Sequence, residues 1–205
     1  MKYRTILLFG APGSGKGTQG KILGTVPGYY HCSCGEVFRR LRPETELGRV
    51  FLRYSSKGRL VPDEFTVRLW RENIAAETQV GHFHPESETL LLDGIPRNAR
   101  QARMLRRSLE VIAVFLLGCP DISQLVHRMQ RRALKDNRLD DANLDTIRKR
   151  IEIYEAETRQ VLECYPARII HPIDAGQSPV RVLRDILEIV EDLNPDTHDK
   201  PPPLH

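Results

Sequence analysis

Short apolar runs alternate along this chain with longer segments in which apolar residues recur at helical spacing. The runs predict strands at residues 5–9, about 29–32, 89–93, 111–117 and 167–173. The other segments predict helices between them, at residues 16–24, 121–133 and 143–163 among others. Continuous apolar runs are typical of strands that are covered on both faces. The pattern therefore predicts an α/β fold in three layers, with helices on both faces of a central parallel sheet.

Three stretches interrupt this alternation. Residues 33–62 show helical spacing to about residue 57, and a break follows before the next helix. The polar turn LKDNRLDD, residues 134–141, separates two predicted helices and is too short to be a domain. Residues 194–205 have no periodicity and contain four prolines, so we expect a flexible tail there. We expect residues 1–193 to form a single domain.

The composition is that of one globular domain. The chain has 205 residues, of which 40% are hydrophobic and 28% are charged, and this length suffices for one core. No apolar run approaches the roughly 20 residues that a membrane span requires. The N-terminal segment also lacks the long apolar region of a secretory signal. We therefore expect a cytoplasmic monomer with no membrane partner.

The cysteines indicate neither a disulfide framework nor a zinc site. The chain has four, at positions 32, 34, 119 and 164, and their spacing is irregular. His31 together with Cys32 and Cys34 could bind a metal, but a second pair of ligands is lacking nearby. We interpret these cysteines as side chains at the end of a strand, and we expect no structural zinc.

The net charge of +4 suits either nucleic acid or small phosphorylated ligands. The arginines lie in clusters beside glycine, proline or aspartate turns, without the interleaved aromatic residues that stack on single-stranded bases. This placement favours small phosphorylated ligands, and we expect no nucleic-acid partner.

The segment GAPGSGKGTQG, residues 10–20, lies between the first predicted strand and the first predicted helix. In such a loop the backbone N–H groups, the positive end of the helix and the Lys16 ammonium together bind phosphate oxygens. The usual loop has Ser or Thr directly after the lysine. Here Gly17 follows Lys16, and the hydroxyl comes one residue later at Thr18. The segment predicts a phosphate-binding loop of variant form.

This loop resembles that of the nucleoside monophosphate kinase family, G-x-P-G-x-G-K-G-T-Q, at every fixed position. The resemblance extends to about residue 190 and is strongest to the adenylate kinases. It implies a P-loop fold with a helical insert that binds the nucleoside monophosphate (NMP), at residues 33–62, and a short lid at residues 131–141. Only five residues separate Arg132 from Arg138, so a long zinc-binding lid does not fit. The ATP-binding residues implied are Gly13, Ser14, Gly15, Lys16, Gly17, Thr18, Arg128 and Arg132.

Three further segments resemble the acceptor site of the family. They are CSCGEVFRR, GRLVPDEFT and DGIPRNARQA, which begin at residues 32, 58 and 93. The AMP-binding residues implied, with two arginines from later segments, are Cys34, Gly35, Arg39, Leu60, Val61, Gly94, Arg97, Gln101, Arg138 and Arg150. The resemblance also implies that Thr18 and Asp93 hold Mg²⁺ through water, and that the catalytic residues are Lys16, Arg97, Arg132, Arg138 and Arg150.

The resemblance implies reversible phosphoryl transfer from MgATP to AMP, which gives two ADP. Two alternatives stay open at this point. Cys34, Glu36 and Asn98 resemble the kinases that phosphorylate UMP and CMP, whereas Gln101 is the residue that reads adenine in adenylate kinases. A non-catalytic P-loop protein that binds nucleotides is the second alternative, suggested by the basic charge. The presence of Asp93, Arg97 and Arg132 argues against it, because a pure binder has no need of these groups.

Overall fold

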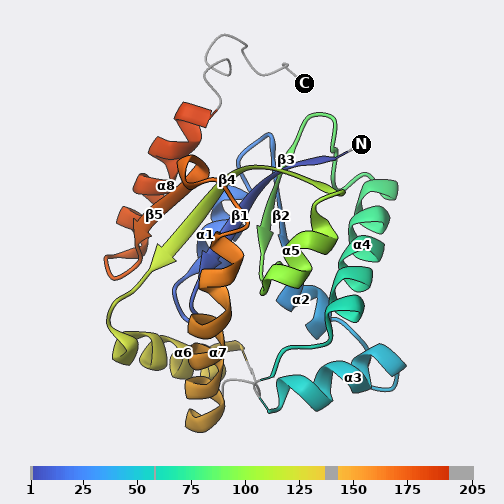
Figure 1. Ribbon diagram of the computed structural model, residues 1–205, viewed down its shortest axis with the longest axis vertical. Helices are drawn as coiled ribbons and strands as arrows, with labels where there is room; N and C mark the ends of the chain where they lie inside the picture. Colours follow the sequence, from blue (N-terminus) through green and yellow to red (C-terminus); the bar gives the residue numbers. More distant parts are fainter. Residues whose placement is uncertain (1, 58, 137–142, 194–205) are drawn as a thin grey trace.

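A central parallel sheet organises the part of the chain that the computed structural model describes, residues 2–57, 59–136 and 143–193. Within these residues the sheet has five strands: β1 (Tyr3–Gly10), β2 (Tyr29–Ser33), β3 (Thr89–Asp93), β4 (Leu109–Gly118) and β5 (Ile170–Asp174). Their order across the sheet is β2-β3-β1-β4-β5, and every neighbouring pair is parallel (Figure 1). The strand that precedes the glycine-rich loop, β1, is therefore the middle strand.

The strand register brings three carboxyl ends to one edge of the sheet. Leu8 of β1 lies beside Asp93 of β3, and Asp93 also lies beside Ser33 of β2. The chain leaves β1 toward β2 on one side, whereas β4 and β5 lie on its other side. Ligands of open α/β sheets bind at such a reversal of strand order, outside the carboxyl ends. The loop after β1 occupies this position.

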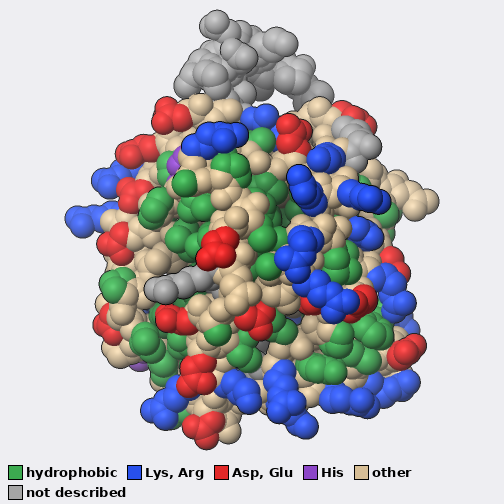
Figure 2. All heavy atoms as spheres, viewed as in Figure 1, with side chains coloured by type: hydrophobic (Ala, Val, Ile, Leu, Met, Phe, Trp, Pro, Cys, Tyr) green, Lys and Arg blue, Asp and Glu red, His purple; other side chains and the backbone are tan. Residues whose placement is uncertain are grey.

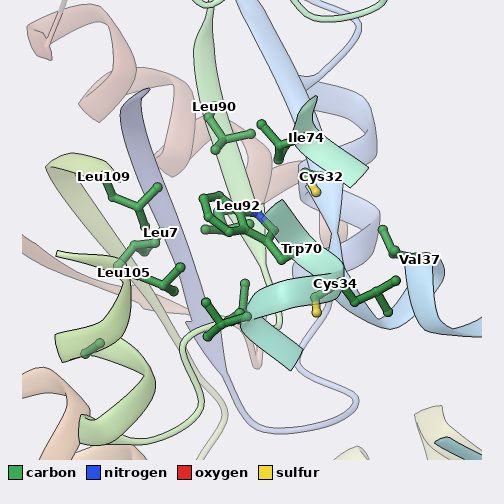
Figure 3. Packing of buried hydrophobic residues seen from close by; sticks show 14 of the residues in the cluster. Leu7, Cys32, Cys34, Val37, Trp70, Ile74, Leu90, Leu92, Leu105 and Leu109 are labelled. Atoms are coloured by element: carbon green, nitrogen blue, oxygen red, sulfur yellow. The ribbon is translucent and has the colours of Figure 1, made fainter. Parts of the chain in front are cut away.

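Helices connect the strands and cover both faces of the sheet. Their bounds are α1 (Lys16–Leu23), α2 (Cys34–Arg39), α3 (Glu46–Ser55), α4 (Asp63–Gln79), α5 (Ala99–Leu105), α6 (Ile122–Asp136), α7 (Leu144–Leu162) and α8 (Pro179–Leu193). Alternate residues of β1 point into two different cores. Leu7 packs with Trp70 of α4 on one face (Figure 3), and Leu8 packs with Ile186 of α8 on the other. The predicted three-layer α/β fold is confirmed.

The last strand differs from its prediction, which placed it at residues 167–173. Ala167–Ile169 form a 3-10 turn, and β5 begins at Ile170. Pro166 has a φ of −61°, and the Ile169 N–H donates to the Pro166 carbonyl oxygen over 3.1 Å. The residues of this turn bond locally, so the pairing with β4 starts only at Ile170.

The segment at residues 33–62 folds as α2 and α3, apart from residue 58, which lies outside the described residues. Thr45 caps α3, since its hydroxyl oxygen accepts from the Gly48 N–H over 3.0 Å. The rings of Phe38 and Phe51 stack with centroids 5.1 Å apart and thereby join α2 to α3. Figure 1 shows α3 at the lower end of the molecule in this view, the end at which α6 also lies.

Basic side chains gather at this same end of the molecule. Figure 2 shows them along the lower edge of the view, where α3 and the ends of α6 and α7 lie in Figure 1. None of the described helices combines the length and the apolarity that crossing a bilayer requires. The predictions for residues 137–141 and for the tail at residues 194–205 fall outside the described residues.

Candidate active site

A cavity of about 800 Å³ opens at the carboxyl edge of the sheet. Its walls come from the glycine-rich loop, from α2 and α3, from the loop after β3, from α6 and α7, and from the loop after β5. Every predicted site residue lines it except Arg138, which lies outside the described residues. The sequence motifs, which are up to 140 residues apart, thus meet in one place by way of the strand order.

The glycine-rich loop has a backbone that only glycine adopts easily at its tightest points. Gly13 and Gly15 have φ values of +86° and +100°, in the left-handed region. A Cβ added to Gly13 would lie 2.8 Å from the Leu125 carbonyl oxygen of α6, so the loop packs directly on that helix. The Ser14 hydroxyl is buried and has no hydrogen-bond partner among the described residues. Positive φ values, close packing and an unused hydroxyl fit a loop shaped to hold phosphate oxygens.

Lys16 bends back over this loop. Its ammonium donates to the carbonyl oxygens of Gly10, over 2.6 Å, and of Ala11, over 3.0 Å. Burial lowers the pKa of Lys16 from 10.5 to about 8, against the raising effect of the nearby Asp93 carboxylate. The guanidinium groups that also lower this pKa belong to Arg97, Arg132 and Arg150. Four cationic side chains therefore act on one point of the cavity, which favours a polyanionic ligand there.

Asp93 ends β3 opposite the glycine-rich loop and is only 8% exposed. Its Oδ2 accepts from the Ser33 hydroxyl over 3.5 Å. A Cβ added to Gly17 would lie 3.7 Å from the same Oδ2, so the loop and this carboxylate face each other closely. Thr18 lines the cavity from the first turn of α1. Carboxylate and hydroxyl oxygens are the hard ligands that Mg²⁺ prefers, and this donor set fits an ion that keeps most of its water.

The predicted acceptor residues lie on the other side of Asp93. Arg97 Nε donates to the Gly94 carbonyl oxygen over 2.9 Å. A Cβ added to Gly94, whose φ is +83°, would lie 3.5 Å from Arg97 Nη2 and 3.8 Å from the Cβ of Cys34. Burial raises the pKa of the Cys34 thiol to about 12. Cys34 is therefore a neutral thiol in this wall, and Arg97 lies beside it.

Gln101 is 1% exposed, and both ends of its amide are engaged. Its Oε1 accepts from the Arg97 backbone N–H over 2.8 Å, and its Nε2 donates to Asp63 Oδ1 over 2.8 Å. Asn98 caps α5 by accepting from the Gln101 N–H, and it also bonds Asp63. Asn98 does not line the cavity, whereas Gln101 does. The capping role accounts for Asn98 without any contact to a base.

Arginines of α6 and α7 reach the cavity from two helices. Arg128 Nη1 donates to the Ala175 carbonyl oxygen over 2.8 Å, in the loop after β5. Arg132 and Arg150 line the cavity from α6 and α7, with Met129 and Ile151 buried beneath them in a separate core. Arg148, which lies on the exposed side of α7, does not line it. The helical spacing of Arg128 and Arg132 predicts their shared face correctly.

Sequence reasoning missed several cavity residues. Lys21 of α1 pairs with Glu36 at 2.7 Å across the cavity wall. Burial acts to raise the pKa of Glu36, but Lys21 together with Arg39 and His31 outweighs this effect, and the pKa is lowered. The other residues missed include Phe51, Arg59, Tyr154 and Gln177. The position of Gln177, directly after β5, was a usable signal, because ligands collect at the carboxyl ends of parallel strands.

Comparison with known proteins agrees with this geometry. A family model described as adenylate kinase matches residues 8–170. The adenylate kinase of Kocuria rhizophila is 36% identical over 192 residues, which cover 91% of this chain and 98% of that protein. That of Cyanothece sp. is 35% identical over 195 residues, 92% of this chain and 95% of that protein. That of Thermobifida fusca is 36% identical over 176 residues, 83% and 89% respectively. The chain belongs to the adenylate kinase family, as the loop, the strand order and these relatives together require.

Proposed function

We propose that this chain catalyses reversible phosphoryl transfer from MgATP to AMP, with the cavity at the carboxyl edge of the sheet as its active site. The convergence of Lys16, Arg97, Arg132 and Arg150 beside Asp93 is the observation that carries this proposal. Phosphoryl transfer needs alignment and charge neutralisation more than covalent chemistry from the protein. A cluster of fixed cations around one carboxylate supplies both.

The donor nucleotide is assigned to the side of the cavity that contains the glycine-rich loop. The backbone N–H groups of this loop, that of Gly15 among them, bind the ATP phosphates, and Lys16 exchanges its two carbonyl partners for phosphate oxygens. Arg128, which the Ala175 carbonyl oxygen holds near the loop after β5, extends this side. Asp93 and Thr18 would hold Mg²⁺ through water, and the ion would there neutralise charge on the ATP phosphates.

The acceptor nucleotide is assigned to the side formed by α2, α3 and the loop after β3. Arg39 and Arg97 bind the AMP phosphate, which places its oxygen in line with the γ-phosphate of ATP. Leu60 and Val61 line the wall for the base, and Gln101 reads its edge. The amide favours adenine. Glu36 is paired with Lys21 in the cavity wall and Asn98 is bonded to Asp63, so Cys34 is the departure that these contacts leave unexplained.

The division of the chain follows from these roles. We assign one kinase domain at residues 1–193, an NMP-binding segment at residues 33–62 and a lid at residues 131–141, of which residues 137–141 lie outside the described part. We also infer a monomer of the cytoplasm. Arg138 belongs to this lid and is assigned to the phosphates by resemblance to the family.

The test is the initial rate of ADP formation with MgATP and each of AMP, CMP, UMP and GMP. We expect a strong preference for AMP, and a loss of about 100-fold or more in kcat/KM for Arg97→Ala. Arg148→Ala is the matched control, since Arg148 is an exposed arginine away from the cavity, and its rate should equal that of the wild type. A preference for CMP or UMP would reassign the acceptor. An absence of transfer to all four acceptors would overturn the catalytic proposal.

A further inference from the structure

Asp63 does not line the cavity, but it bonds to Gln101, which does. It is the first residue of α4, and its side chain is 13% exposed. One carboxylate oxygen, Oδ1, accepts from Gln101 Nε2 over 2.8 Å and from Asn98 Nδ2 over 2.9 Å. The other oxygen lies 3.9 Å from Arg100 Nε. Partners on both oxygens hold this carboxylate in one position behind Gln101.

The two contacts of the Gln101 amide allow only one of its two orientations. A carboxylate only accepts hydrogen bonds, and the Arg97 backbone N–H only donates one. A flipped amide would place Oε1 against the Asp63 carboxylate and the NH₂ group against the Arg97 N–H, which is repulsive at both ends. The 2.8 Å contacts at each end therefore fix Nε2 toward Asp63 and Oε1 toward Arg97.

This orientation leaves one N–H and one lone pair of the amide for a ligand. Nε2 carries two hydrogens, of which Asp63 takes one, and Oε1 has two lone pairs, of which Arg97 takes one. The free pair matches adenine, whose N1 accepts and whose N6 donates. Hypoxanthine, guanine and uracil present the reverse pattern at the same edge, a ring N–H donor beside a carbonyl acceptor. An amide that cannot flip rejects the reverse pattern, because its own groups would stay unpaired in a buried site.

We propose that Asp63 is a positioning residue that sets the base selectivity of the acceptor site by preventing the Gln101 amide from flipping. This inference rests on the proposed function, since it assigns Gln101 to the acceptor base. It extends that function to a residue outside the cavity, whose effect depends entirely on Gln101.

The test compares AMP with IMP as acceptors. Inosine has the size of adenosine but the reverse hydrogen-bond pattern, so the ratio of their kcat/KM values isolates the amide orientation. We expect the wild type to prefer AMP strongly. Asp63→Ala and the near-isosteric Asp63→Leu should lower the AMP to IMP ratio by about tenfold or more, mainly through KM. Asp63→Asn keeps an oxygen acceptor at the same place and should retain most of the ratio.

Two controls separate positioning from a structural effect. Glu64→Gln removes the neighbouring carboxylate, which pairs with Arg100 and not with Gln101, and should leave the ratio unchanged. In a Gln101→Ala background, Asp63→Leu should no longer change the ratio, because Asp63 acts through Gln101. A loss of folding stability alone would lower the rates with AMP and IMP equally, and circular dichroism melting verifies that each variant is folded.

The outcomes are distinct. A wild type that transfers to AMP, with an unchanged ratio in folded Asp63→Leu, overturns the inference about Asp63 and leaves the proposed function standing. The inference about Asp63 also fails if Asp63→Leu lowers the ratio equally with and without Gln101. A wild type that transfers no phosphoryl group to AMP overturns the proposed function and this inference together.

Discussion

Lys16 is bonded to the loop from which it extends. Its ammonium bonds to the carbonyl oxygens of Gly10 and Ala11, two residues of the loop that it serves. Burial lowers its pKa from 10.5 to about 8, so the ammonium is present below pH 8 and is lost as the pH rises above it. A bound phosphate stabilises the ammonium and raises this pKa.

We therefore predict that ATP affinity falls as the pH rises above 8. Binding must then supply a proton to Lys16, and the dissociation constant should increase by up to about tenfold per pH unit. Titration calorimetry between pH 7.5 and 9.5, without magnesium, measures this directly. Lys16→Met should bind ATP weakly and without the pH dependence. A wild-type dissociation constant that stays flat over this range would contradict the assignment.

The cysteines give a second prediction at this scale. Burial raises the pKa of Cys32 and of Cys34, and only the thiolate reacts with alkylating reagents. At pH 8 iodoacetamide should therefore modify the exposed Cys164 first and spare Cys32 and Cys34, with activity retained. Peptide mass spectrometry identifies the modified sites, and in urea all four cysteines should react. Fast modification of Cys34 in the folded protein would show that its wall of the cavity opens.

Among the elements, α3 depends on a glycine inside a helix. Alanine is normally favoured over glycine there by about 1 kcal/mol. At Gly48, however, a Cβ would lie 2.0 Å from the Arg42 carbonyl oxygen in the loop that precedes the helix. We predict that Gly48→Ala lowers the free energy of unfolding by about 1–3 kcal/mol, since the backbone must shift to admit a methyl group.

The same substitution should raise the KM for AMP, because Phe51 and Ser55 of α3 line the cavity. Urea denaturation and steady-state kinetics measure the two effects. Arg53→Ala, at an exposed position of the same helix, is the control and should change neither. A Gly48→Ala variant with greater stability than the wild type would show that the loop at Arg42 yields easily.

The strands that were predicted best from sequence were the continuous apolar runs. The apolar runs of β1 and β3 predicted both buried strands, because strands covered on both faces have few polar positions. The run at residues 167–173 was also predicted as one strand, but it contains Arg168 and His171, and Pro166 and a local hydrogen bond turned its first residues into a 3-10 turn. Helix α5, with seven residues, was too short to predict as a separate element.

The residues of the site likewise fall into those that were predicted from sequence and those that were not. Sequence reasoning found the loop, Asp93 and the arginines, because each lies in a contiguous motif that resembles a known family. It missed Tyr154 and Gln177, which reach the cavity only through the packing of α7 and the position of β5. It also missed the bond between Asp63 and Gln101, since the two residues are 38 positions apart and no local pattern pairs them.

At the scale of the whole molecule, residues of α3 and α6 line the cavity from two sides. Closure around nucleotides is an established property of adenylate kinases. We predict that a ligand with two adenosines joined by a chain of phosphates protects the amides of both α3 and α6 from hydrogen exchange. ATP alone should protect α6 and the glycine-rich loop but leave α3 largely unprotected. Exchange followed by mass spectrometry distinguishes the two helices. Equal protection of α3 by ATP alone would contradict the assignment of the acceptor to that side.

The pairing of β1 with β3 has a consequence for the reaction itself. The donor loop follows β1, the acceptor arginine follows β3, and Leu8 lies directly beside Asp93. Neighbouring strands are held about 4.8 Å apart by their backbone hydrogen bonds. The separation between the strand ends that carry the glycine-rich loop and Arg97 is thus set by main-chain spacing, which side-chain substitutions leave unaltered. Residues 33–62 and 131–141 can therefore change in sequence while the backbone ends from which the glycine-rich loop and Arg97 extend stay the same distance apart.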